Sequence, residues 1–113
     1  GGHLVSGHVD GVGEVFHIAP VDQDADGSWL LRIKAPKDLA PFLAYKGSIV
    51  VNGVSLTVNA AEDTADACIV NINLIPHTLQ STTLGKLKMG DRVNLEVDLI
   101  ARYVARMLES KSK

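Results

Sequence analysis

Apolar and polar residues alternate along most of the chain, a pattern typical of β-strands that bury one face. In residues 28–35, Trp29, Leu31 and Ile33 alternate with Leu30, Arg32 and Lys34. A second run, 67–76, is rich in β-branched residues and ends at Pro76, and residues 92–98 alternate again. These runs predict several short antiparallel strands.

The strands are separated by strong turn signals. Asn52-Gly53 divides residues 47–63 into two apolar runs, which predicts a tight hairpin turn. Residues 3–20 form another strand-like run, which its glycines are expected to bend and Pro20 to close.

Three segments between the strands predict other local structure. The polar residues 22–27 predict a turn in which Gly27 takes a positive φ. Residues 36–43 contain two prolines and are expected to form one helical turn. Residues 77–85 are expected to hold a short helical turn that Gly85 stops.

The end of the chain has helical periodicity. Its apolar residues form one stripe at helical spacing: Leu99, Ile100, Tyr103, Val104, Met107 and Leu108. Asp98 precedes them and is suited to cap the helix N-terminus. Because the helix is short, we expect it to pack on the strands or on a partner. The fold class expected is mainly β: six antiparallel strands in a closed barrel over residues 1–97, then a helix and a polar tail over 98–113.

Composition narrows the function. The chain has 113 residues, 46% of them hydrophobic, and a net charge of -2, which fits one soluble domain. It has no basic stripe, and the positive residues Lys86, Lys88 and Arg92 are expected to form a solvated turn. Aromatic residues make up only 4% of the chain. Both features argue against an oligonucleotide-binding barrel, and no apolar run is long enough to span a membrane.

The chain contains one cysteine, Cys68, which excludes an internal disulfide and a multi-cysteine metal site. Apolar residues flank Cys68, and no base lies near it in sequence, so we expect a buried core residue rather than a nucleophile. A lone cysteine fits a reducing cytoplasm.

The glycine-rich stretch GGHLVSGHVDG is the most distinctive motif near the N-terminus. In a strand, His3 and His8 point to opposite faces, and no further ligand completes a metal site. A phosphate loop would need a following helix. Two interpretations stay open: a bent edge strand with a hydrogen-bonded histidine, or a catalytic pair of His8 with Ser6 or Asp10.

Hydroxyl side chains form the other candidate cluster. Ser55, Thr57 and Thr78 lie beside bulky aliphatic residues, which suits a neutral planar heterocycle with polar edges. Simple strand alternation explains Ser55 and Thr57 about equally well. The residues alone therefore predict a small cytoplasmic β-barrel that binds a ligand.

Four longer motifs occur in order: GGHLVSGHVDGVG, YKGSIVVNGVSLTV, INLIPHTLQSTTLG and GDRVNLEVDLIARYVARML. Together they closely resemble the C-terminal half of riboflavin synthase of the α-subunit type. The resemblance covers nearly the whole chain, apart from 22–27 and the tail. It implies two tandem six-stranded Greek-key barrels in the full-length protein and a C-terminal helix that holds a homotrimer. The absence of an initiator methionine and of a first barrel leads us to expect the second barrel and the helix alone.

The resemblance also implies an activity. Riboflavin synthases are transferases in which two molecules of 6,7-dimethyl-8-ribityllumazine exchange a four-carbon unit, giving riboflavin and 5-amino-6-ribitylamino-uracil. No metal or organic cofactor takes part. The site forms between the second barrel of one subunit and the first barrel of its neighbour. We therefore expect lumazine and riboflavin binding, with weak or absent turnover by this half alone; the alternative is a non-catalytic lumazine- or flavin-binding protein.

The family resemblance implies roles for particular residues. His8 is the candidate proton shuttle or hydrogen-bond partner, Ser55 and Thr57 are expected to orient a nucleophile, and Asp98 to orient His8 as well as cap the helix. The substrate-binding residues implied are Gly7, His8, Val9, Lys46, Ser55, Leu56, Thr57, Asn73, Leu74, Ile75, Pro76, His77 and Thr78. Leu56 and Ile75 are expected to cover the ring faces, and His3 to serve structure at the barrel junction.

Two positions depart from the family pattern. Asn52 stands where relatives often carry an acidic residue, and we interpret it as a turn position. His77 stands where relatives often carry glutamate; main-chain contacts there would survive the change, whereas a side-chain contact would not.

Overall fold

The computed structural model describes residues 7–111. The expectations for His3 and Ser6, and for the last two residues of the tail, fall outside this range. Eleven elements follow one another in the described part: β1 Gly11–Pro20, β2 Trp29–Pro36, η1 Lys37–Phe42, β3 Ser48–Val51, β4 Val54–Thr57, β5 Ala60–Asp63, β6 Ala67–Leu74, α1 Pro76–Ser81, η2 Thr83–Lys86, β7 Arg92–Val97 and α2 Leu99–Lys111. η1 and η2 are turns of 3₁₀ helix.

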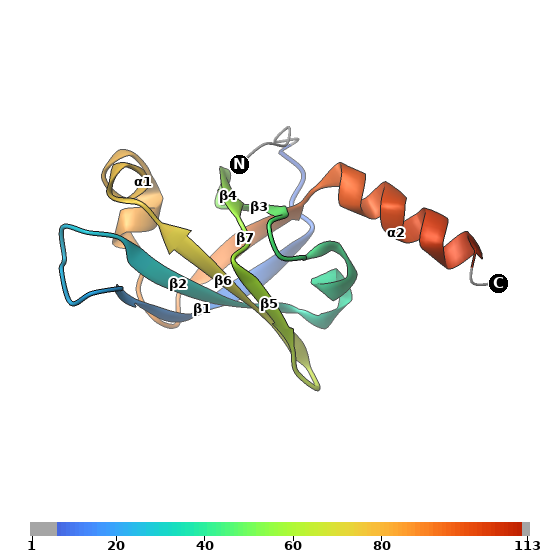
Figure 1. The fold of residues 1–113 in the computed structure, drawn as a ribbon, viewed down its shortest axis with the longest axis horizontal. Helices are drawn as coiled ribbons and strands as arrows, with labels where there is room; N and C mark the ends of the chain where they lie inside the picture. The colour runs from blue at the N-terminus through green and yellow to red at the C-terminus, as the bar shows by residue number, and fades with distance from the viewer. Residues whose placement is uncertain (1–6, 112–113) are drawn as a thin grey trace.

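All strand pairs are antiparallel and form one curled sheet in the order β4-β3-β7-β1-β2-β6-β5 (Figure 1). The mainly β fold with a C-terminal helix is thus confirmed. The number of strands differs: the described residues contain seven, whereas six were predicted. The difference lies in residues 54–63, predicted as one strand and observed as two.

Residues 54–63 change partner partway along. β4 pairs with β3, and Val58 continues that ladder, since its N–H donates to the Gly47 carbonyl over 2.8 Å. The next residue turns to another strand: the Asn59 N–H donates to the Asn71 carbonyl over 2.8 Å, and β5 then pairs with β6. One continuous segment therefore belongs to both ends of the sheet, which is how the sheet curls toward closure.

The core lies inside the curl. Alternate residues of each strand supply it, including Leu31 and Ile33 of β2, which are fully buried as the sequence predicts. Cys68 is buried in the same cluster, which confirms the prediction of a core residue. β1 carries an irregularity in its pairing between Val15 and His17, consistent with the expected bending of this strand.

Two glycine predictions are wrong. In the turn 22–27, Gln23 takes the positive φ of 60°, and Gly27 does not take one. Gly85 does not stop the helical turn after Pro76: α1 ends at Ser81, and Gly85 lies inside η2. A Cβ on Gly85 would collide with the Leu79 carbonyl, so close backbone packing explains the glycine.

The helix α2 is confirmed, and so is its cap. The Asp98 Oδ1 accepts a hydrogen bond from the Ile100 N–H over 2.9 Å. The helix extends away from the sheet, and η1 is the element it packs against most (Figure 1). Its predicted apolar stripe is exposed, with Ile100 at 67% and Met107 at 64%. Within the described residues, no helix is long and apolar enough to cross a membrane.

Candidate functional site

The candidate site begins at two strand edges that lack a partner among the described residues. β4 pairs with β3 on one side only, and it is an edge of the sheet. β5 pairs with β6 only as far as Asn71, so the last three residues of β6, 72–74, have no partner on that side. β4 and β6 lie close together. We call this place, between β4 and the end of β6, the split; its walls offer free backbone donors and acceptors.

The β4 wall carries the predicted hydroxyls. Ser55 and Thr57 point to one face of the strand, and Leu56 points to the other, where it packs in the core. The predicted cover of a ring by the Leu56 side chain is therefore not available, and only its backbone faces the split. The Ser55 Oγ is buried and makes no hydrogen bond, although buried hydroxyls are nearly always paired.

Lys46 lies beside the end of β4. Its N–H donates to the Val58 carbonyl over 2.8 Å, and it holds a positive φ of 68°. The ammonium group stands 5.5 Å from the centre of the Tyr45 ring, and both side chains are exposed. The Lys46 side chain thus presents a positive charge to solvent beside Tyr45.

The β6 wall carries the other predicted run. Asn73 is exposed and lines a cavity of about 410 Å³ together with His17 and Asn59, whereas the Leu74 side chain is fully buried. Ile75 is 51% exposed and precedes Pro76, the first residue of α1. An apolar side chain and an amide therefore stand at the open end of this wall.

The first turn of α1 follows. Thr78 is partly buried, and its carbonyl accepts from the Thr82 hydroxyl over 2.7 Å. His77 is exposed, with its Nδ1 3.5 Å from the Ser81 Oγ. The fold thus brings Ser55 and Thr57 of β4 close to the end of β6, which carries Asn73 and Leu74. Lys46 lies beside the end of β4, and residues 75–78 follow directly after β6.

Gly7, His8 and Val9 lie apart from that group, over β3 and β7. Gly7 and Val9 line a cavity of about 240 Å³ with Val50. Val50 opposes Ser55 on one side and Glu96 on the other, so the three side chains share the outer face of the sheet. The backbones of β4 and β7 are two strand spacings apart, or about 10 Å. Val50 therefore lies between Ser55 of β4 and the cavity that Gly7 and Val9 line.

Sequence reasoning missed Glu96. Its exposed fraction is only 6%, and its Oε1 accepts from the Gly7 N–H over 3.2 Å. The alternation in residues 92–98 places Glu96 on the outer face, which is normally wet. It is buried because the segment at Gly7 covers it, and no local pattern reveals that cover.

Comparison with known proteins agrees with the resemblance stated from the motifs. Residues 6–98 match the family model of the lumazine binding domain. Riboflavin synthase of Brucella abortus (strain 2308) is 44% identical over 109 residues, covering 96% of this chain and 50% of that protein. Riboflavin synthase of Bacillus subtilis (strain 168) is 40% identical over 114 residues, covering 100% and 49%. The chain spans about half the length of the curated relatives it matches.

Solved structures give the same picture. LumP complexed with 6,7-dimethyl-8-(1'-D-ribityl) lumazine is similar with a TM-score of 0.68 and 29% identity, covering 85% of this chain and 49% of that chain. LumP complexed with riboflavin gives a TM-score of 0.69 and 31% identity, covering 83% and 47%. Motifs, family model and relatives agree over most of the sequence, and the chain therefore belongs to the lumazine binding domain family.

Proposed function

We propose that this chain binds 6,7-dimethyl-8-ribityllumazine and riboflavin at the split and contributes half of a riboflavin synthase site. The observation that carries the proposal is the buried Ser55 Oγ without a partner, next to unpaired backbone on both walls. A lumazine or flavin ring has carbonyl and N–H edges that such groups bind. The riboflavin synthase relatives and the two ligands named for LumP support the same ligand class.

The proposed chemistry is the transfer of a four-carbon unit from one lumazine to another, which gives riboflavin and 5-amino-6-ribitylamino-uracil. Two lumazines must be held together, and holding reactants in contact lowers the barrier. We therefore propose that a second lumazine-binding barrel, from the part of the protein that the relatives have beyond this chain, completes the site. The assembly proposed is a trimer formed through α2, supported by the exposed apolar stripe of that helix.

We assign a proposed role to each residue according to its place at the split. Ser55 and Thr57 bind the ring edge and orient a water nucleophile, and residues 73–78 bind through their backbone and through the exposed Ile75. Lys46 provides the positive charge. His8 moves a proton or holds a hydrogen bond. Asp98 caps α2, and a second role toward His8 is part of the proposal.

Three further expectations belong to this proposal. The first is a closed six-stranded Greek-key barrel, in which residues 54–63 are counted as one bent strand. The second is a domain boundary at residue 97, and the third is a location in the cytoplasm. The shared pairing of residues 54–63 supports the first, and the helix that begins at Leu99 supports the second. The single cysteine, which is free and buried, supports the third.

Riboflavin titration tests the proposal. Quenching of flavin fluorescence should saturate with the unaltered protein, and Thr57→Ala should lower the affinity by about tenfold, as expected for a lost polar contact in a site. Thr83→Ala is the matched control, because Thr83 is also an exposed threonine and lies in η2, outside the residues assigned to the site. Absence of quenching, or equal loss in both variants, would contradict the proposal.

The second candidate function is a lumazine- or flavin-binding protein without catalysis, favoured by the similarity to LumP. Riboflavin formation from the lumazine separates the two. The rate should rise when the remaining half of the riboflavin synthase is supplied with this chain. Ligand binding without any riboflavin formation under those conditions would favour the second candidate.

A further inference from the structure

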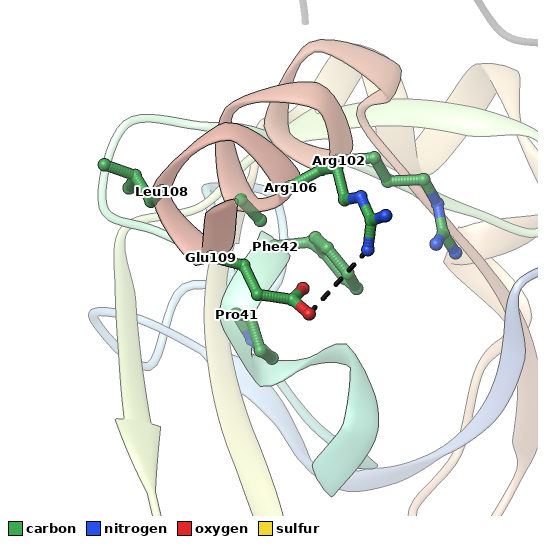
Figure 2. A pocket seen from close by; sticks show the side chains of 7 residues that line it. Pro41, Phe42, Arg102, Arg106, Leu108 and Glu109 are labelled. Atoms are coloured by element: carbon green, nitrogen blue, oxygen red, sulfur yellow. Dashed lines mark ion pairs between the residues drawn. The ribbon is translucent and has the colours of Figure 1, made fainter. Parts of the chain in front are cut away.

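Arg102 attaches α2 to the rest of the chain. Its Nη2 donates to the Asp10 Oδ1 over 2.6 Å, and its guanidinium lies 4.7 Å from the centre of the Phe42 ring. The next arginine on the helix behaves differently: Arg106 pairs with Glu109 of the same helix over 3.7 Å. Figure 2 shows the Arg102 side chain extending away from that pair. Arg102 is therefore an anchor, and Arg106 is a surface residue.

Asp10 joins α2 to the end of β7. Its other oxygen, Oδ2, accepts from the Val97 N–H over 2.8 Å, and its own N–H donates to the Leu95 carbonyl over 2.8 Å. The Asp10 side chain is only 18% exposed. Since charge-assisted bonds are stronger when partly shielded from water, this carboxylate fixes the position of residue 10 and of the first turns of α2 together.

The segment before Asp10 is held at its other end as well. The Gly7 N–H donates to the buried Glu96 carboxylate. His8 and Val9 therefore lie between Gly7 and Asp10, two residues only three positions apart that are each held by a hydrogen bond to a carboxylate oxygen. A chain this short, with planar peptide bonds and both ends fixed, has few conformations left. The position of the His8 backbone thus depends on both Glu96 and Asp10.

We propose that the Asp10–Arg102 pair positions His8 for ligand binding, so that the way α2 is held is transmitted to the site. Asp10 and Arg102 are positioning residues: they act through the backbone of residues 7–10 and touch no ligand. This inference rests on the proposed function, because His8 matters to the ligand only if the chain binds one. It makes α2 part of the binding apparatus as well as an assembly element.

The test compares two arginines of one helix. Arg102→Gln should weaken riboflavin binding by about threefold to tenfold, the usual size of coupling through a packed network. Arg106→Gln should leave the affinity unchanged. In a His8→Ala background, Arg102→Gln should cause no further loss, and Arg102→Lys, which keeps the charge for Asp10, should recover most of the affinity in the unaltered background.

The outcomes separate positioning from simple stabilisation. If Arg102→Gln weakens binding equally with and without His8, the pair is merely structural and the inference is overturned. If Arg102→Gln does not fold, Asp10→Asn takes its place, because an amide oxygen still accepts from Val97 while the ion pair is lost.

Amide hydrogen exchange keeps this inference separate from the proposed function. Arg102→Gln should speed exchange at the Gly7 amide, which is bonded to Glu96 and far from the substitution in sequence. Faster exchange supports the link even if the unaltered protein binds no riboflavin, a result that would sink the proposed function alone. Unchanged exchange at Gly7 overturns the link.

Discussion

Asn52 and Asn94 are joined by two hydrogen bonds that cross from the β3–β4 turn to β7. The Asn52 N–H donates to the Asn94 carbonyl over 2.9 Å, and the Asn52 Oδ1 accepts from the Asn94 N–H over 2.8 Å. Asn52 and Gly53 both have positive φ, 48° and 82°, as the predicted hairpin turn requires. One side chain thus fixes the turn and the neighbouring strand at once.

Replacing Asn52 should therefore destabilise the fold. Asn52→Ala removes the acceptor and places alanine at a positive φ, which together cost about 1 to 2 kcal/mol. Asn52→Asp keeps the oxygen and should change stability by less than about 0.5 kcal/mol. Urea unfolding of the two variants checks this, and equal stabilities would contradict the role of the side-chain oxygen.

Gly85→Ala should destabilise the chain by about 1 to 3 kcal/mol, because its Cβ would press against the Leu79 backbone carbonyl. Gly27→Ala is the control, since its Cβ would approach Asp24 no closer than 3.4 Å. The control should shift the thermal midpoint little. A similar loss in both variants would mean that the turn, rather than close packing, selects glycine at Gly85.

Ser55→Ala should separate stability from binding. The Ser55 Oγ is buried without a partner, so its removal should leave the free energy of unfolding equal or raise it by up to about 1 kcal/mol. Riboflavin affinity should fall in the same variant. A hydroxyl that served the fold would show the opposite result, with lower stability and unchanged affinity.

Stability should decline at alkaline pH through Cys68. Burial raises the pKa of this thiol above its ordinary value of 9.0, and the neighbouring Asp63 carboxylate acts in the same direction. In the unfolded chain the thiol loses its proton at a lower pH than in the folded chain. The stability that the protonated, buried thiol contributes is therefore fully present below about pH 9 and is lost as the pH rises through the pKa in the folded state. The slope is at most about 1.4 kcal/mol per pH unit. Cys68→Val should flatten the decline between pH 8 and 10; identical profiles would exclude the thiol as its source.

Polar substitution of the α2 stripe should reduce self-association. Tyr103 and Met107 are 66% and 64% exposed. Burying such a side chain in an interface contributes about 1.5 to 3 kcal/mol. Tyr103→Ser with Met107→Ser should therefore weaken the association constant by more than about tenfold in sedimentation equilibrium. An unchanged constant would place the contact elsewhere.

Local sequence patterns predicted most helices, strands and turns well, because these elements depend on residues that are neighbours in the sequence. Asn52-Gly53 carries its own turn geometry, and Asp98 with the stripe after it specifies a capped helix. The break between Val58 and Asn59 was missed because it depends on two different partner strands. The burial of Glu96 was missed for a similar reason, since it requires Gly7, far away in sequence.

For the candidate site, too, the local features could be predicted from the sequence and the long-range ones could not. The hydroxyl residues Ser55 and Thr57 could be identified in the sequence as a candidate polar cluster, and the family resemblance supplied the role that we propose for them. The sequence analysis expected Leu56 to cover a ring face, whereas the Leu56 side chain packs in the core and Ser55 and Thr57 point to the opposite face of β4. That depends on the register with β3, which long-range pairing determines.

The change of partner within residues 54–63 has a consequence for how such a site varies between relatives. Where one strand leaves its neighbour for another, it leaves main-chain groups exposed whatever side chains the strand carries. In the proposed function, recognition at that place would use the main chain, so a change of side chain there would leave the backbone hydrogen-bonding groups in position.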